Sequence, residues 1–189
     1  MRTLRRDLLS VIAILLLAFS HPAKAQTSVY GTIGFSDYGY TFNSYGDNFY
    51  GDYPSFGGGL TYIFLQRAVT LGVDLRDTYT ANSLHGGETG AISLRAGFVP
   101  APHPCHPYVQ LGGGFISAKV PASSYTVGAQ TINTGSVSIA VGLDVDINRS
   151  LSIRAIEIES TVGTKSYPSA ATASFSSGIV YHFPNSKKS

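Results

Sequence analysis

The stretch Thr134–Asp146, TGSVSIAVGLDVD, alternates apolar and polar side chains along its length. Apolar residues occupy every second position from Val137 to Val145, and Ser, Ala, Gly or Asp occupies the positions between them. A period of two residues is that of a β-strand, in which successive side chains point to opposite faces of the sheet. The stretch therefore predicts a strand with one apolar face and one polar face, and the polar face carries Asp144 and Asp146.

The same alternation recurs along the chain in short segments that Gly, Pro, Asn and Ser separate, and no helical pattern of any length follows residue 25. We count eight such segments, and an even number of strands is typical of bacterial outer-membrane barrels. The predicted strands are roughly Val29–Tyr38, Pro54–Gln66, Val69–Thr80, Glu88–Val99, Pro107–Ala118, Thr134–Asp146, Leu151–Val162 and Ala173–Phe183.

The predicted connections between strands differ in length. Short turns follow the second and sixth strands, and a Pro-rich segment at 100–106 follows the fourth. The other connections are generally longer, at residues 39–53, 81–87, 119–133 and 163–172. Short turns at one end and longer loops at the other characterise transmembrane β-barrels, and both chain ends then lie on the short-turn, periplasmic side.

The composition excludes several classes of protein. The 189-residue chain is 43% apolar, which is too hydrophobic for a disordered chain. Its single Cys cannot form an intramolecular disulfide, so the chain is not a disulfide-stapled scaffold. A net charge of +2 gives no electrostatic footprint for nucleic acid, and we expect no nucleic-acid partner.

Residues 1–25 have the features of a secretory signal peptide. Three arginines precede the apolar run Leu8–Phe19, and the triplet at 23–25, AKA, has the pattern of a cleavage site. The apolar run has 12 residues, whereas a membrane-spanning helix needs about 20. We therefore expect export and a mature chain that begins at Gln26.

The chain then divides into a signal peptide at 1–25, a barrel domain at 26–183 and a short polar tail at 184–189. The signal segment carries a net charge of +3, so the net charge of the mature chain is −1. The sequence pI of about 8.6 describes the precursor and says little about partners.

The two faces of the predicted strands indicate the solvent around the barrel. One face is nearly pure Val, Ile, Leu and Phe, and the other mixes Gly, Ser and Thr with charged residues. In lipid the apolar face points outward and the polar face lines the lumen. We therefore predict an all-β fold, an eight-stranded antiparallel up-and-down transmembrane β-barrel. The alternative is a soluble periplasmic or secreted barrel that resembles lipocalins and binds an apolar ligand.

Charged residues deep in the strands are the candidate functional residues of the lumen. They are Asp74, Arg76, Arg95, Asp144, Arg154, Glu157 and Glu159. Eight strands enclose a lumen just wide enough for side chains to fill, and an unpaired charge there is costly. We expect a network of salt bridges that closes the lumen to solutes, and a narrow pore is the alternative.

Relative height along the strands predicts which of these charges meet. Asp74 and Arg95 fall within about one residue step of each other, and Arg154 lies near Asp144. Arg76 and the two glutamates lie higher. Because Arg154 and the glutamates differ in parity, all three can face inward only if a β-bulge lies near residues 155–156.

The first long loop is rich in aromatic residues. They include Tyr38, Tyr40, Phe42, Tyr45, Phe49, Tyr50 and Tyr53. Aromatic rings at a wet edge supply contact area at low entropic cost, which favours a surface for lipopolysaccharide, host or neighbouring proteins. The alternative is an aromatic girdle at the membrane interface with strand extensions above it.

The last predicted strand ends in SSGIVYHF at 176–183, which resembles the C-terminal assembly signal of bacterial outer-membrane proteins through Gly178, Tyr181 and Phe183. The resemblance implies recognition by the barrel assembly machinery, although the family's aromatic residue is usually terminal and here a tail follows it. The whole mature chain resembles the small eight-stranded OmpA/OmpX-like outer-membrane barrels. This resemblance implies a bacterial outer-membrane location and contact with lipid and lipopolysaccharide, and we expect a monomer.

We predict no catalytic, metal or cofactor site. His103, Cys105 and His106 are of metal-ligand type, but Pro104 breaks the run and three ligands within four residues cannot easily converge on one ion. A periplasmic turn with a free thiol is favoured, and an intermolecular disulfide through Cys105 is the alternative. Some barrels modify lipid A, but His85 is the one His on the outer side and the deacylase motif His-x-Ser-Asn is absent.

Overall fold

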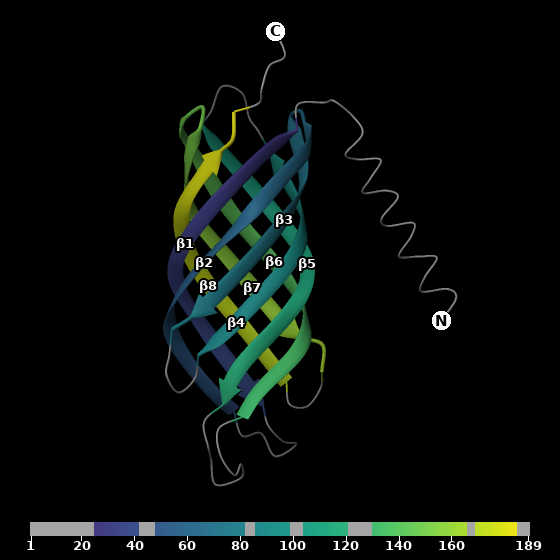
Figure 1. Cartoon of the computed structure of the whole chain (residues 1–189), viewed down its shortest axis with the longest axis vertical. Helices are drawn as coiled ribbons and strands as arrows, with labels where there is room; N and C mark the ends of the chain where they lie inside the picture. The colour runs from purple at the N-terminus through teal and green to yellow at the C-terminus, as the bar shows by residue number, and fades with distance from the viewer. Residues whose placement is uncertain are drawn as a thin grey trace, which may run out of the picture.

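The computed structural model describes residues 25–41, 48–81, 86–98, 104–120, 130–165 and 169–184. The described residues form eight strands. They are β1 (Gln26–Thr41), β2 (Asn48–Gln66), β3 (Val69–Thr80), β4 (Gly87–Phe98), β5 (Cys105–Val120), β6 (Gln130–Asn148), β7 (Leu151–Gly163) and β8 (Ser169–His182). Each strand pairs with the next, and β8 pairs antiparallel with β1, so that the sheet closes into a barrel (Figure 1). The eight-stranded antiparallel barrel predicted from the alternation is confirmed.

The two ends of the barrel differ. The start of β1 and the end of β8 lie at one end, where the connections at 67–68 and 149–150 are two residues long (Figure 1). We call this the turn end and the opposite end, where residues 42–47 and 121–129 connect strands, the loop end. The expected signal peptide at 1–25 and the tail at 184–189 lie almost wholly outside the described residues. No helix within the described ranges is long and apolar enough to cross a bilayer.

The strands at the loop end are longer than the sequence predicts. The segment 39–53 is mostly strand, because β1 and β2 stay in register out to the pair Thr41 and Asn48. In the same way, β5 and β6 remain paired out to Val120 and Gln130, within the predicted loop at 119–133. Gly, Asn and Ser in these segments are typical of loops, but the backbone pairing of the neighbouring strand carries them into the sheet.

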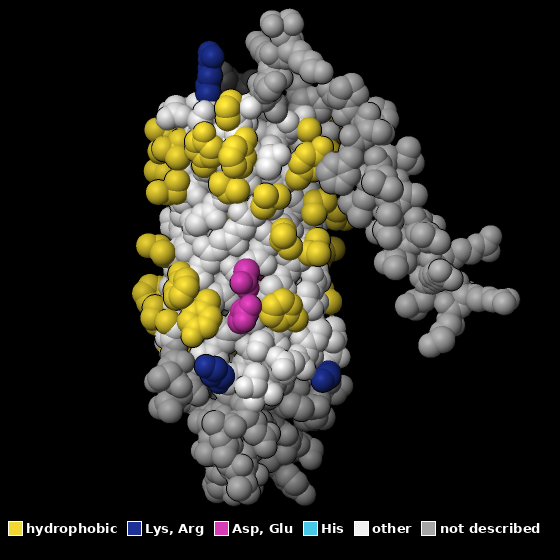
Figure 2. Space-filling view, viewed as in Figure 1, with side chains coloured by type: hydrophobic (Ala, Val, Ile, Leu, Met, Phe, Trp, Pro, Cys, Tyr) yellow, Lys and Arg dark blue, Asp and Glu magenta, His cyan; other side chains and the backbone are white. Residues whose placement is uncertain are grey.

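Apolar side chains cover the outside of the barrel, and polar ones fill the inside. Ile33 is 73% exposed and Leu94 67%, whereas Asp74 and Arg154 are fully buried. Figure 2 shows apolar side chains spread over the barrel wall. This arrangement is the inverse of a soluble protein and suits a barrel surrounded by lipid. The lipocalin-like alternative, which requires an apolar interior, is wrong.

A β-bulge in β7 brings residues of both parities to the inner face. The pairing of β7 with β8 shifts between Arg154 and Glu157, and the pairing with β6 shifts between Leu143 and Asp144. One extra residue in β7 is therefore accommodated at 155–156. The bulge predicted from the parity of the charged residues is confirmed.

Candidate functional site

Arg76 on β3 is the centre of the charged network in the lumen. Its Nη1 donates to Glu157 Oε1 and Glu159 Oε2, both at 2.8 Å. Its Nη2 donates to Gln110 Oε1 at 2.7 Å and to Glu157 Oε2 at 2.9 Å. Its Nε lies 3.3 Å from Asp74 Oδ1. All five donor directions of the guanidinium point at oxygen in this arrangement, so Arg76 is hydrogen-bonded to three strands and its charge is compensated by carboxylates on β3 and β7.

A second group of charges lies nearer the turn end. Asp144 on β6 accepts from Arg95 Nη2 at 2.6 Å and from Arg154 Nε at 3.1 Å. Arg154 Nη1 also lies 3.2 Å from Glu157 Oε2. Glu157 thus joins the two groups into one network that crosses the lumen. Pairing of this kind is needed because an unpaired charge in a low-dielectric interior is costly.

Two buried tyrosines complete the network. Tyr30 Oη donates to Asp74 Oδ1 at 2.8 Å, and Tyr108 Oη donates to Glu157 Oε2 at 2.5 Å. The Arg154 guanidinium carbon lies 4.1 Å from the centre of the Tyr30 ring, and that of Arg95 lies 3.6 Å from the centre of the Tyr108 ring. Each ring therefore offers a hydrogen bond through its hydroxyl and a cation–π contact through its face.

Glycines on neighbouring strands leave room for these two rings. A Cβ at Gly59 would overlap the Tyr30 ring, and one at Gly142 would overlap the Tyr108 ring. Both glycines lie on the inner face, next to the strand that carries the tyrosine. A large side chain on one strand thus lies over a glycine on the neighbouring strand. This complementary packing is expected of a narrow barrel.

The structure brings together some of the predicted pairs and not others. All seven predicted lumen charges are buried, and Arg154 lies beside Asp144 as expected. The expected neighbours Asp74 and Arg95 have other partners: Asp74 pairs with Arg76, and Arg95 pairs with Asp144. Residue height along strands does not account for the reach of a long side chain, and Arg95 extends toward β6 while Asp74 stays near its own strand.

Sequence reasoning missed Tyr30, Tyr108 and Gln110, which belong to the same network. Each alternates in phase with the small and polar residues of its strand, and therefore lies on the inner face. That parity was the available signal, because an aromatic or amide side chain on the inner face of a narrow barrel must contact the charges there.

Most aromatic residues of the first predicted loop lie in strands. Tyr38 is only 1% exposed and packs inside the loop end of the barrel with Ile116, Ala118 and Ala170, so its prediction as a surface residue is wrong. Its position on the inward parity of β1 explains this burial. Tyr40 lies in β1 and Phe49, Tyr50 and Tyr53 lie in β2, whereas Phe42 and Tyr45 fall outside the described residues.

These side chains leave little space in the middle of the lumen. Beside Arg76, Glu157 and Glu159 lies a cavity of about 10 Å³, which is close to the space of one water. The apolar cluster of Tyr38 and Ile116 lies further toward the loop end. The described part of the lumen is therefore filled by side chains over much of its length.

A polar vestibule of about 200 Å³ opens below the network at the turn end. Within it, His182 Nδ1 lies 2.7 Å from Ser28 Oγ, and His182 Nε2 lies 2.6 Å from Ser152 Oγ. Ser152 Oγ donates to Asp146 Oδ1 at 2.6 Å, so its single proton is used there and His182 Nε2 must donate to it. Both serines are buried, so this chain of hydrogen bonds offers no exposed nucleophile.

Metal-ligating side chains do not converge within the described residues. No group of three or more His, Cys, Asp or Glu side chains there has the arrangement of a metal site. His106 Nε2 lies 2.8 Å from Asp146 Oδ2, and Cys105 at the start of β5 is a free, partly exposed thiol. His85 and His103 fall outside the described residues.

The residues of the predicted assembly signal lie at the seam where β8 closes the barrel on β1. Gly178 is paired with Thr32, and a Cβ there would overlap the carbonyl oxygen of Gly31. Tyr181 and Phe183 are exposed, and their rings meet edge to face with 5.3 Å between centres. Gly178 therefore permits the close approach of the two strands, while the aromatic pair faces outward near the turn end.

Comparison with solved structures places this barrel among known folds. The N-terminal β-barrel domain of Pseudomonas aeruginosa OprF has a TM-score of 0.55 at 16% identity, covering 85% of this chain and 100% of that domain. Neisserial surface protein A has a TM-score of 0.51 at 12% identity, covering 82% of this chain and 97% of that protein. Ail, the attachment invasion locus protein of Yersinia pestis, has a TM-score of 0.48 at 18% identity, covering 84% of this chain and 99% of that protein. No family model and no curated protein matches the sequence.

The fold and the apolar outer wall define the class of this protein. It has the fold of the small eight-stranded outer-membrane β-barrels, with a polar, charge-paired interior. An apolar wall of this kind requires a membrane around it, and barrels of this architecture belong to the bacterial outer membrane.

Proposed function

We propose that the protein is a closed outer-membrane barrel with a structural or interaction role, of the envelope-stabilising or adhesion type. The carrying observation is the filled lumen: Arg76 and Glu157 link opposite walls, Asp144 holds Arg95 and Arg154 beside them, and Tyr38 packs in the apolar cluster toward the loop end. A barrel with such an interior is a rigid membrane anchor. Its function is then exerted by the loops and by the outer wall.

The mechanism that follows is passive. The apolar wall holds the barrel in lipid, the turn end faces the periplasm and the loop end faces the exterior, as in other barrels with this asymmetry. We propose that the aromatic residues at the loop end of β1 and β2 present a contact surface to lipopolysaccharide or to neighbouring or host proteins. They include Tyr40, Phe49 and Tyr50, together with Phe42 and Tyr45 of the connection.

Single-channel recording on the refolded protein tests the closed lumen. We expect no sustained conductance from the unmodified barrel. As a matched pair, Tyr38→Ala and Tyr79→Ala remove one ring each, the first inside the lumen and the second on the outer wall. A brief or small conductance in the first variant alone supports a plugged lumen, and sustained large conductance in the unmodified protein contradicts it.

We further propose that Gly178, Tyr181 and Phe183 are read by the barrel assembly machinery during insertion. The supporting observation is that the two aromatic rings face outward near the turn end of β8. Assembly kinetics with reconstituted machinery, measured for Phe183→Ala against Phe175→Ala, test this role. Slower assembly of the first variant with equal stability after folding is expected, and equal rates contradict the proposal.

We infer that the protein works as a monomer and without enzymatic chemistry of its own. The buried serines of the vestibule support the second point, because neither Ser28 nor Ser152 is open to a substrate. Light scattering in detergent should report one chain per particle. Incubation with lipid A or with phospholipid should leave both chemically unchanged by mass spectrometry, and any deacylated product contradicts the inference.

A further inference from the structure

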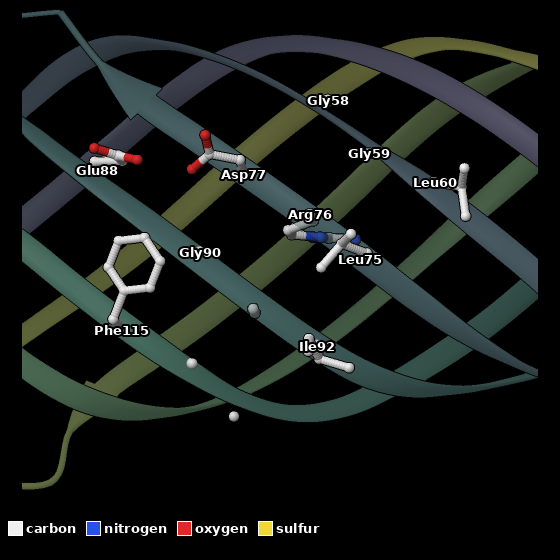
Figure 3. A pocket seen from close by; sticks show the side chains of 13 residues that line it. Gly58, Gly59, Leu60, Leu75, Arg76, Asp77, Glu88, Gly90, Ile92 and Phe115 are labelled. Carbon is white, nitrogen blue, oxygen red and sulfur yellow. The ribbon is translucent and has the colours of Figure 1, made fainter. Parts of the chain in front are cut away.

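A groove of about 540 Å³ runs over the outer wall of the barrel across β2, β3, β4 and β5. Outward-facing glycines form its floor, namely Gly58, Gly90 and Gly113. Leu60, Leu75, Ile92 and Phe115 supply its apolar sides (Figure 3). The groove is therefore a gap in the apolar wall, of the size of a ligand pocket, at a surface that meets lipid.

Two carboxylates lie in this largely apolar groove, which Arg76 also lines while its buried guanidinium pairs with Glu157 in the lumen. Asp77 is directly opposite Gly58 on one side and Gly90 on the other, so neither cross-strand neighbour covers it. Glu88 lies two residues closer to the loop end than Gly90 on β4, opposite Tyr79. Figure 3 shows Asp77 and Glu88 toward the same end of the groove, with Leu60 and Ile92 toward the other.

Both carboxylates are exposed, and they lie at the level of apolar side chains. Tyr79, whose ring contacts that of Phe56 in a tilted arrangement with 5.1 Å between ring centres, is nearer the loop end than Asp77 on the same strand. Figure 2 shows carboxylates on this face with apolar side chains beside them. Aromatic rings of such barrels mark the membrane interface, so the groove carries negative charge at or below that level.

The two groove carboxylates form no ion pair within the described part of the chain, and Lys119, which is exposed two residues beyond Ser117 on the outer face of β5, pairs with neither. A carboxylate near the bilayer is costly unless a cation or a hydrogen-bond donor compensates it. The occupant of the groove should therefore bring positive charge at the loop end and an apolar body toward the middle of the membrane.

We propose that the groove binds one lipid whose headgroup carries a protonated primary amine. The ammonium donates to Asp77 and Glu88, and one acyl chain lies along Leu60, Leu75 and Ile92 over Gly113. The carboxylates at the loop end face the headgroup of an outer-leaflet lipid in the orientation proposed above, and the apolar part of the groove faces its acyl chain. Lipid binding itself does not depend on that orientation, so it can be tested separately from the closed lumen.

A divalent cation that bridges the carboxylates to a lipid phosphate is the less suitable occupant. Calcium takes six to eight oxygen ligands and magnesium requires near-octahedral geometry. The groove offers two carboxylates, and no cluster of three metal-ligating side chains occurs among the described residues. An ammonium group needs only hydrogen-bond acceptors, which two carboxylates supply.

Native mass spectrometry of the refolded full-length mature barrel in detergent tests the proposal. The probes are ethanolamine, choline and glycerol phospholipids with identical acyl chains, titrated in the presence of EDTA. We expect the ethanolamine lipid to bind about fivefold more tightly than the choline lipid, which matches one exposed ion pair. Equal binding of the three lipids, or binding that EDTA removes, overturns the proposal.

Matched variants separate the two parts of the site. The double substitution Asp77→Asn with Glu88→Gln should abolish the ethanolamine preference, whereas Asp37→Asn with Asp52→Asn removes two outward carboxylates elsewhere and should keep it. A preference unchanged by the first pair overturns the role of the groove carboxylates. Heat modifiability on a gel checks that each variant is folded.

The second pair of variants tests the floor of the groove. Gly113→Leu fills it, and Cβ at this position would have its nearest neighbour, Ser136 O, at 3.3 Å. Ala173→Leu adds the same bulk on the outer face of β8. We expect Gly113→Leu alone to weaken binding of all three lipids severalfold. A dimer that only Gly113→Leu dissociates would assign the groove to a second copy and overturn the proposal.

Discussion

Arg76 and Glu157 form a two-pronged ion pair across the full width of the lumen. Nη1 lies 2.8 Å from Oε1 and Nη2 lies 2.9 Å from Oε2. The two residues are 81 positions apart, on β3 and β7, which are as distant as two strands can be in a closed barrel of eight. The pair therefore braces opposite walls, and its bidentate geometry holds both side chains in one orientation.

Removal of Arg76 should strongly destabilise the barrel. Arg76→Met leaves Glu157, Glu159 and Asp74 buried without their shared cation, which costs about 3–5 kcal/mol for a broken buried pair. Urea unfolding in lipid vesicles, followed by the shift of the folded band on a gel, measures the loss. Arg67→Met, in the exposed turn between β2 and β3, is the control and should change stability by less than about 0.5 kcal/mol. Equal losses would contradict the central role of Arg76.

The hydroxyl and the ring of Tyr108 should make separable contributions. Tyr108→Phe removes the hydrogen bond to Glu157 and keeps the ring beneath Arg95, so we expect a loss of about 1–3 kcal/mol. Tyr108→Leu also removes the cation–π contact and should cost about 0.5–2 kcal/mol more. The same unfolding assay measures both. If the leucine variant were as stable as the phenylalanine variant, the ring would contribute only volume.

Gly142 should be intolerant of a side chain because the Tyr108 ring occupies its space. Gly142→Val should cost about 1–3 kcal/mol through overpacking of the lumen. In the double variant with Tyr108→Ala, the added valine should cost much less than it does alone. A double-mutant cycle on unfolding free energies measures this coupling, and additive effects would show that the two sites do not interact.

The outer wall should respond to charge according to depth. Val141 lies near the middle of β6 and faces outward, so Val141→Arg should cost about 2–4 kcal/mol in a bilayer. Ile147, exposed near the turn end of the same strand, is the control, and Ile147→Arg should cost about 0–1 kcal/mol. Vesicle unfolding measures both, and a penalty without depth dependence would argue against a surrounding bilayer.

Much of the fold was predictable because parity decides which face a residue occupies. The alternation around Val141 and Asp144 predicted the strand, its two faces and the inward charge, and the parity conflict at Arg154 predicted the bulge. Parity carries no information on reach, however. It therefore could not show that Arg95 extends to Asp144 rather than to Asp74.

The extent of the strands was less predictable, since local composition and sheet pairing disagree there. Tyr38 lies in a segment rich in Gly, Asn and Asp, which by itself is typical of a loop. The register of β1 with β2 and β8 continues past it, so the residue becomes an interior one. Such continuation depends on the neighbouring strands and is not visible in the segment alone.

The bulge in β7 also determines how this strand tolerates a change of length. Because it contains one surplus residue, a chain that lacks Ala155 would keep Arg154, Glu157 and Glu159 in the same phase, on a regular strand that still faces the lumen. Loss of one residue elsewhere, such as Ser160, would instead exchange inside for outside along the remainder of the strand. The spare residue marks the place in β7 where evolution or design can shorten the strand without turning charges toward lipid.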